Sequence, residues 1–254
     1  MAYRQLEEQL REPSWQKPIP KPQRPVGRQR ELTALQRILS HVGKHPTPLH
    51  TWIWGSQGAG KTHCAQYAAS ELAETRQASV ACSNCWNSNS LYALVNDIVD
   101  QFSILRAELQ DTRFKIERIK KHMDKKQCIY IIDGIDRLDT KERNAVLYQF
   151  HEMGNFWIVA ISNETPQKLG IEPRVWSRLS PIFVNFNPYT TKEIIQLLKH
   201  DLEKSDHKTK PTAKQLQEIA EQSGGDARFA KKLLTQKVML GLSDVAHSHT
   251  GRTR

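Results

Sequence analysis

The segment Thr51-Trp-Ile-Trp-Gly-Ser-Gln-Gly-Ala-Gly-Lys-Thr62 decides the fold of this chain. Its first four residues are a short apolar strand, the run Gly55-x-x-x-x-Gly60-Lys61-Thr62 follows directly, and a helical pattern continues to about residue 72. A glycine-rich loop between a strand and a helix suits phosphate, because backbone N–H groups turn inward and the helix N-terminus adds partial positive charge. Lys61 is then expected to contact the β- and γ-phosphates, and the Thr62 hydroxyl to ligate Mg²⁺. The predicted phosphate-binding loop is Gly55, Ser56, Gln57, Gly58, Ala59, Gly60, Lys61 and Thr62.

The remaining apolar segments predict four more strands, at about residues 78–82, 128–133, 156–162 and 182–186. Helical periodicity precedes each strand, from a first helix at about 31–42 to a charged helix at about 104–126. Strands that alternate with helices indicate a parallel sheet covered on both faces. From residue 191 onward the pattern is wholly helical, at about 191–204, 212–222 and 226–240. We therefore expect an α/β fold over residues 26–190, with a parallel five-stranded sheet flanked by helices, and a small α-helical subdomain at 191–240.

The two ends of the chain have a different composition. Residues 1–25 carry prolines interleaved with Lys and Arg from Pro13 to Pro25, so they predict an extended basic arm without a core. Residues 241–254 are polar and predict a disordered tail.

The charge balance favours an acidic partner. Lysine and arginine total 37 against 27 aspartates and glutamates, a net charge of +10. Nucleic acid is the commonest such partner, because neutralising phosphates releases condensed counterions, although a basic solvated surface gives the same balance. We expect largely sequence-independent DNA binding.

Other classes of protein find little support in the sequence. No apolar run approaches the roughly 20 residues that span a bilayer, so no membrane partner is expected. Four cysteines do not suggest a disulfide framework, and Cys82-x-x-Cys85 is half a zinc site without a second pair. These features predict a cytoplasmic or nucleoid-associated protein, or a nuclear one in a eukaryote.

Asp133 ends the apolar run Cys128-Ile-Tyr-Ile-Ile-Asp133. A buried parallel strand places such a residue at its carboxyl end, where open α/β sheets bind ligands. Asp133 is therefore a candidate to hold the magnesium of the nucleotide, although an aspartate there also caps helices and turns.

Further motifs occur in a characteristic order. With the glycine-rich loop they resemble the AAA+ ATPases over about residues 24–240, and within them the origin-recognition and replication-initiator group of archaea and eukaryotes. That resemblance implies ATP and Mg²⁺ as cofactors. It also implies that the α-helical subdomain at 191–240 is the lid, the subdomain that follows the nucleotide-binding domain in this family. The motifs are Pro25-Val-Gly-Arg-Gln-Arg-Glu-Leu32, Asp133-Gly-Ile-Asp-Arg-Leu138, Ser162-Asn163, Val175-Trp-Ser-Arg-Leu179, Phe186-Asn-Pro-Tyr-Thr190 and Gly225-Asp-Ala-Arg228.

The resemblance also implies roles for three single residues. Asn163 looks like the polar residue that orients water near the γ-phosphate. Arg178 resembles an arginine finger, which acts in trans on the nucleotide of a neighbouring AAA+ subunit and so implies a homo- or hetero-oligomer. Arg228 looks like the residue that reports the γ-phosphate to the lid. Guanidinium suits both arginine roles, because it is always charged and grips phosphate oxygens bidentately.

One position departs from the family pattern. The family usually has glutamate directly after the strand-ending aspartate, and this chain has Gly134. We therefore expect ATP binding with slow hydrolysis, which Gly134→Glu would speed, unless Asp136 supplies the missing carboxylate.

The leading hypothesis is an ATP-dependent DNA-binding switch that oligomerises and organises a nucleoprotein complex, as replication initiators do. A winged-helix domain, usual after the lid in that group, is not expected here. The alternatives are an ATPase regulator of DNA transposition that recruits a transposase, and a nucleotide-bound scaffold that does not hydrolyse ATP.

Overall fold

A computed structural model describes residues 22–76, 78–104, 111–124, 126–204 and 211–239. Most of the predicted N-terminal arm, and the whole of the tail predicted at 241–254, lie outside these residues. The described residues group into two compact units. The first runs to Gly55 and resumes over Gly60–Phe186, and the second combines Ser56–Ala59 with the residues from Asn187 onward.

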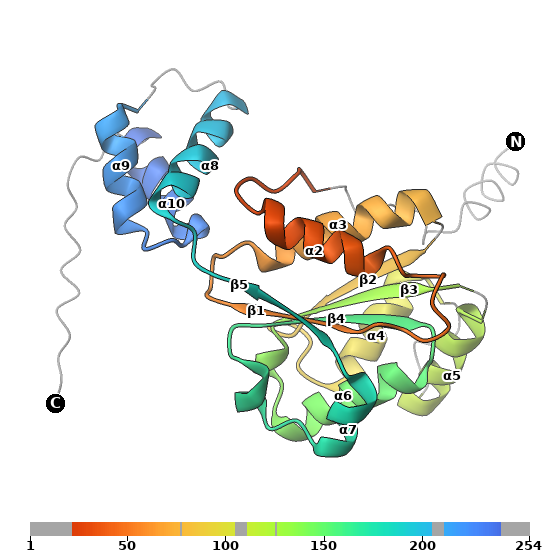
Figure 1. Ribbon diagram of the computed structural model, residues 1–254. Coiled ribbons are helices and arrows are strands. Elements are labelled where there is room, and N and C mark those ends of the chain that lie inside the picture. The colour runs from red at the N-terminus through yellow and green to blue at the C-terminus, as the bar shows by residue number, and fades with distance from the viewer. Residues whose placement is uncertain (1–21, 77, 105–110, 125, 205–210, 240–254) are drawn as a thin grey trace, which may run out of the picture. The chain divides into compact units, whose positions relative to one another are not determined.

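The first unit is built on a five-stranded sheet with the order β2-β3-β4-β1-β5 (Figure 1). Every neighbouring pair is parallel, as expected where helices connect the strands. The predicted α/β class with a parallel five-stranded sheet is therefore confirmed. The strands are β1 (Thr51–Gly55), β2 (Ser79–Asn84), β3 (Cys128–Asp133), β4 (Phe156–Ser162) and β5 (Ile182–Phe186).

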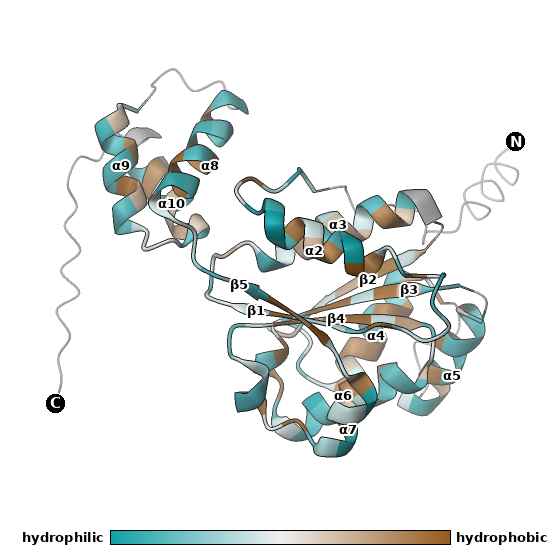
Figure 2. Ribbon diagram, in the orientation of Figure 1, coloured by the Kyte–Doolittle hydropathy of each residue, from teal (hydrophilic) through white to brown (hydrophobic). Residues whose placement is uncertain are grey.

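Helices cover both faces of this sheet. Figure 1 shows α2 and α3 on one face and α4 to α7 on the other, and Figure 2 shows the apolar residues concentrated on the strands and on the helix surfaces that face them. The helices are α2 (Gln29–Leu39), α3 (Lys61–Arg76), α4 (Leu91–Gln101), α5 (Thr112–His122), α6 (Thr140–Glu152) and α7 (Pro173–Leu179), with short 3₁₀ turns η2 (Ile135–Arg137) and η3 (Pro166–Leu169).

The core between the sheet and α6 contains a cluster of aromatic rings. The ring centre of Phe150 lies 4.6 Å from that of Tyr130 and 5.5 Å from that of Phe156. All three side chains are fully buried. Because parallel strands carry apolar residues on both faces, these rings fill the core between β3, β4 and α6.

The charged helix predicted at 104–126 is shorter than expected. The Asp111 side chain accepts a hydrogen bond from the Phe114 N–H (2.8 Å) and caps a helix that begins at Thr112 and ends at His122. Ile104 lies outside this helix, so the prediction was wrong there, because it continued the helical pattern across the cap.

The second unit is helical. Its helices are α8 (Thr191–Lys204), α9 (Ala213–Gln222) and α10 (Ala227–Leu234), and the chain continues as a π-helical turn over Thr235–Met239. Thr212 and Gln215 form a capping box at the start of α9. Lys231 of α10 pairs with Asp201 of α8 at 2.7 Å. No helix in the described parts of the chain is long and apolar enough to cross a membrane.

Candidate nucleotide-binding site

Three neighbouring strands end together at one edge of the sheet. The parallel register sets Trp54 of β1 beside Ser162 of β4, and Asp133 of β3 beside Ile161 of β4. The edge therefore collects Gly55, Asp133 and the residue after β4. Strand β1 has to end in glycine. The φ of Gly55 is +149°, and a Cβ added to Gly55 would lie 2.0 Å from the Phe186 carbonyl oxygen.

Thr62 and Asp133 meet at this edge. The Thr62 hydroxyl, in the first turn of α3, donates a hydrogen bond to Asp133 Oδ2 at 2.9 Å. A hydroxyl beside a carboxylate is the oxygen donor set that Mg²⁺ prefers alongside phosphate oxygens. These two residues are therefore suited to hold magnesium at the end of β3.

Lys61 begins a chain of polar contacts across the same edge. Its Nζ donates to the Gly55 carbonyl oxygen (2.9 Å) and to Asn163 Oδ1 (3.0 Å), and its side chain is buried. Asn163 in turn donates to both carboxylate oxygens of Asp136, from its backbone N–H (3.2 Å) and from Nδ2 (3.3 Å). The structure thus brings Lys61, Asn163 and Asp136 together. The side-chain amide of Asn163 lies between the Lys61 ammonium and the Asp136 carboxylate.

Gly134 occupies a conformation that glycine favours. Its φ is 74° and its ψ is 37°, in the left-handed region, where it caps the turn η2. An added Cβ would lie 3.7 Å from both Trp86 Cδ1 and Arg137 Cγ. A glutamate here would therefore be strained, and its side chain would start toward Trp86 and Arg137. The expectation that Gly134→Glu speeds hydrolysis does not fit this geometry.

Trp86 is a feature that the sequence did not single out. Its side chain is 67% exposed, and the Arg137 guanidinium lies over the indole at 4.0 Å from the ring centre. This cation–π pair rests beside the Gly134 turn. Trp52 and Trp157 are fully buried in the core, and Trp54 and Trp176 are partly buried.

The partners of Arg178 are not residues of the Lys61, Asn163 and Asp136 cluster. Arg178 is on α7, where it is exposed, pairs with the Glu152 carboxylate and lies over the Tyr148 ring at 5.1 Å. Both partners belong to α6. The proposed action of Arg178 on a neighbouring subunit remains a prediction.

Arg228 and part of the glycine-rich loop belong to the second unit. The Arg228 backbone N–H donates to Asp226 Oδ1 at 2.8 Å, at the start of α10. Within the same unit, the Gly58 carbonyl oxygen accepts a hydrogen bond of 3.2 Å from the Ala227 N–H. The role of Arg228 toward the γ-phosphate remains a prediction, as do those of Ser56, Gln57 and Ala59.

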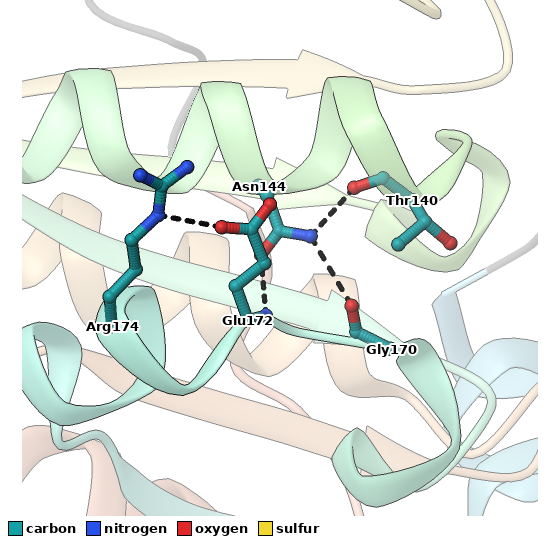
Figure 3. A network of polar contacts seen from close by, with 5 residues as sticks. All are labelled: Thr140, Asn144, Gly170, Glu172 and Arg174. Carbon is teal, nitrogen blue, oxygen red and sulfur yellow. Dashed lines mark hydrogen bonds and ion pairs between the residues drawn. The ribbon is translucent and has the colours of Figure 1, made fainter.

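Two adjacent residues of α6 hold the loops around the site, although no sequence pattern indicated them. Asn144 Nδ2 donates to the carbonyl oxygens of Thr140 (2.7 Å) and Gly170 (3.2 Å), and its Oδ1 accepts from the Glu172 N–H (2.8 Å) (Figure 3). Its neighbour Arg143 is buried and bonds to backbone carbonyls of η2 and η3. In the charged segment Thr140–Glu152 such residues look like an exposed helix face.

Burial keeps several titratable groups uncharged in the first unit. His50 Nδ1 accepts from the Ile158 N–H (3.2 Å), so its Nε2 carries the proton and donates to His151 Nδ1 at 3.0 Å. Desolvation, with His151 nearby, lowers the pKa of His50 to about 3. Desolvation likewise raises the pKa of the Cys85 thiol to about 12. Within the described ranges, no three His, Cys, Asp or Glu side chains gather as a metal site.

Comparison with known proteins identifies the family of this chain. The family model of the AAA domain matches residues 44–179, more than half of the chain. The chain therefore belongs to the AAA domain family. The proteins that it is similar to include ORC1-type and Cdc6p proteins.

Three archaeal proteins illustrate the similarity. The chain is 26% identical to an ORC1-type DNA replication protein of Pyrococcus abyssi, over 89% of this chain and 60% of that protein. Among solved structures, the ORC1 protein of Aeropyrum pernix in complex with DNA gives a TM-score of 0.72 at 23% identity, covering 89% of this chain and 63% of that one. The Cdc6p structure from Pyrobaculum aerophilum gives 0.72 at 18% identity, covering 88% and 64%. The chain thus spans about 60% of the length of the P. abyssi relative.

Proposed function

We propose that this chain is an ATP-dependent DNA-binding switch of the replication-initiator type. The polar cluster at the edge of the sheet is the observation that carries the proposal. Lys61 is positioned for phosphate, Thr62 and Asp133 form an oxygen donor pair for Mg²⁺, and Asn163 links the lysine to Asp136. Bound magnesium would neutralise phosphate charge, and the protein residues would orient the nucleotide around it.

For hydrolysis, we propose that Asp136 replaces the carboxylate that Gly134 lacks. Asp136 contacts Asn163 through both of its carboxylate oxygens, and Asn163 contacts Lys61. A water near the phosphate end of this chain would find an amide to orient it and a carboxylate to accept its proton. Because the carboxylate is shared with Asn163, we expect slow turnover. Asp136→Asn should lower turnover further while sparing ATP affinity. An Asp136→Asn variant that hydrolyses ATP as fast as the wild type would exclude this role.

DNA is the proposed macromolecular partner. The net charge of +10 supports phosphate contacts, and the A. pernix ORC1 relative was solved in complex with DNA. Both the ORC1-type and the Cdc6p relatives favour an initiator-like role over the transposition alternative. We further propose that subunits assemble on DNA with Arg178 reaching the nucleotide of a neighbour, and that the protein works where chromosomal DNA is found.

Two measurements test this proposal. Calorimetry should show ATP binding that weakens when magnesium is removed. Affinity for two duplexes of unrelated sequence, measured with ATP and with ADP across a salt series, should fall steeply with salt, be alike for both duplexes and differ between the nucleotides. A nucleotide-independent affinity would contradict the switch, and a flat salt response would contradict the phosphate contacts.

A further inference from the structure

Arg143 forms a bridge between the two loops that carry the catalytic candidates. Its Nε donates to the carbonyl oxygen of Ile135 at 3.0 Å, and one terminal nitrogen donates to the carbonyls of Asp136 (3.3 Å) and Leu138. The other terminal nitrogen donates to the Leu169 carbonyl. The first three carbonyls belong to η2 and its end, which follow Asp133. The fourth ends η3, which follows Asn163.

Burying the Arg143 guanidinium costs free energy unless its hydrogen bonds keep good geometry. The Arg143 side chain is only 5% exposed, and its donors reach neutral carbonyl oxygens. Burying a cation requires compensation by hydrogen bonds, and the planar fork of a guanidinium can satisfy carbonyls on two sides at once. An ammonium group is a single point with three donors, and it cannot reproduce that fork.

The bridge bears directly on the contact between Asp136 and Asn163. Asp136 is the middle residue of η2, and Asn163 begins the segment that leads into η3. Their hydrogen bonds of 3.2 and 3.3 Å are long, so a small shift of either loop would break them. Arg143 joins the backbones on both sides of that contact.

We propose that Arg143 is the positioning residue that keeps Asp136 and Asn163 in register for ATP hydrolysis. It acts through the two loops, whose backbone carbonyls it binds. The inference rests on the proposed hydrolytic role of Asp136 and adds the device that fixes its geometry. Asn144, the next residue, fastens the segment that leads into α7 in the same way (Figure 3).

The test compares Arg143→Lys with a control that destabilises the same helix elsewhere. Phe150→Leu is suitable, because the apolar ring of Phe150 packs against Tyr130 and Phe156 and cannot join the hydrogen bonds of Arg143. Both variants are compared by thermal unfolding, ATP affinity, steady-state turnover per nucleotide-binding site and amide hydrogen exchange. Arg143→Met, which is apolar, replaces Arg143→Lys if the buried ammonium prevents folding.

Arg143→Lys is expected to keep its ATP affinity, to lose about 10- to 100-fold in kcat, as misplacement of a catalytic group by about 1 Å does, and to speed exchange of the Asn163 amide. Phe150→Leu should melt earlier yet keep its kcat and its Asn163 protection. Wild-type kcat and exchange in Arg143→Lys, or equal losses in Phe150→Leu, would overturn the proposal.

The exchange measurement separates this inference from the proposed function. If the wild type does not hydrolyse ATP, the hydrolytic role of Asp136 fails, and with it the catalytic purpose of the bridge. In that case, exchange of the Asn163 amide that is faster in Arg143→Lys but not in Phe150→Leu would show that the bridge exists but serves nucleotide binding or structure. Loss of kcat without any change in exchange would refute the bridge while leaving the ATPase proposal intact.

Discussion

Gly134→Glu would test whether the backbone or the missing carboxylate limits hydrolysis. A residue with a Cβ in the left-handed region costs about 1–2 kcal/mol, and the stiffer unfolded chain returns about 0.4–1 kcal/mol. The net loss of roughly 1 kcal/mol should lower the Tm by about 2–4 °C in a protein of this size. The new side chain should start toward Trp86 and Arg137, because an added Cβ is 3.7 Å from each. Turnover should therefore not rise.

Gly134→Ala is the matched control for this experiment. It carries the same backbone cost without a carboxylate, so both variants should melt at about the same temperature. Steady-state phosphate release should be no faster in Gly134→Glu than in Gly134→Ala. Turnover in Gly134→Glu clearly above that of both the control and the wild type would refute the reasoning, since the carboxylate would then reach the reacting water despite the turn.

The remaining predictions concern three other residues. Lys61→Ala should weaken ATP binding by at least about tenfold by calorimetry, because a hydrogen bond to a charged group contributes roughly 1.5–3 kcal/mol, whereas the exposed Lys168→Ala should not change it. Arg178→Ala should reduce turnover and assembly on DNA while sparing ATP binding by the single subunit, and equal effects of the exposed Arg174→Ala on the same helix would argue against a finger. The pKa of His50 is about 3 in the folded protein, below its ordinary 6.5, so the unfolded chain binds a proton at His50 more readily than the folded protein does. The contribution of His50 to the free energy of unfolding should therefore be full above pH 6.5 and fall by up to about 1.4 kcal/mol per pH unit below it. His50→Gln should flatten that dependence in urea unfolding measured from pH 7 to pH 4, and an unchanged slope would assign it to other groups.

The sequence predicted the sheet well because its strands are short apolar runs with clear ends. The bounds of β3, β4 and β5 are those expected, and β1 and β2 differ by one or two residues at their ends. The glycine-rich loop and Asp133 were found because their chemistry is tied to fixed spacing and to strand ends. Asn163, which the resemblance to the AAA+ ATPases implied, lies one residue beyond β4 and accepts a hydrogen bond from Lys61.

Other features of the site depend on contacts that spacing does not encode. Glycine at position 134 is compatible with many backbone conformations, so the left-handed turn and its effect on glutamate needed coordinates. Arg143 looks like a solvated residue among charged neighbours, and only the fold brings η2 and η3 to its two sides. Asp111 was not identified as a cap, because the helical pattern on either side of it seemed continuous.

The strand order has a consequence for how the chain is made. Strand β1 lies between β4 and β5, which are synthesised roughly a hundred or more residues later. Until then the strand that ends at Gly55 has neither hydrogen-bonded neighbour, and contacts of such long sequence separation form slowly. A nascent chain on the ribosome that stops before Ile182 should therefore not hold nucleotide, although the whole glycine-rich loop has already been translated. ATP binding would then begin only after β5 has been synthesised and has paired with β1. Until that point the apolar strand β1 is unpaired, and it is the segment of the nascent chain that chaperones are expected to bind.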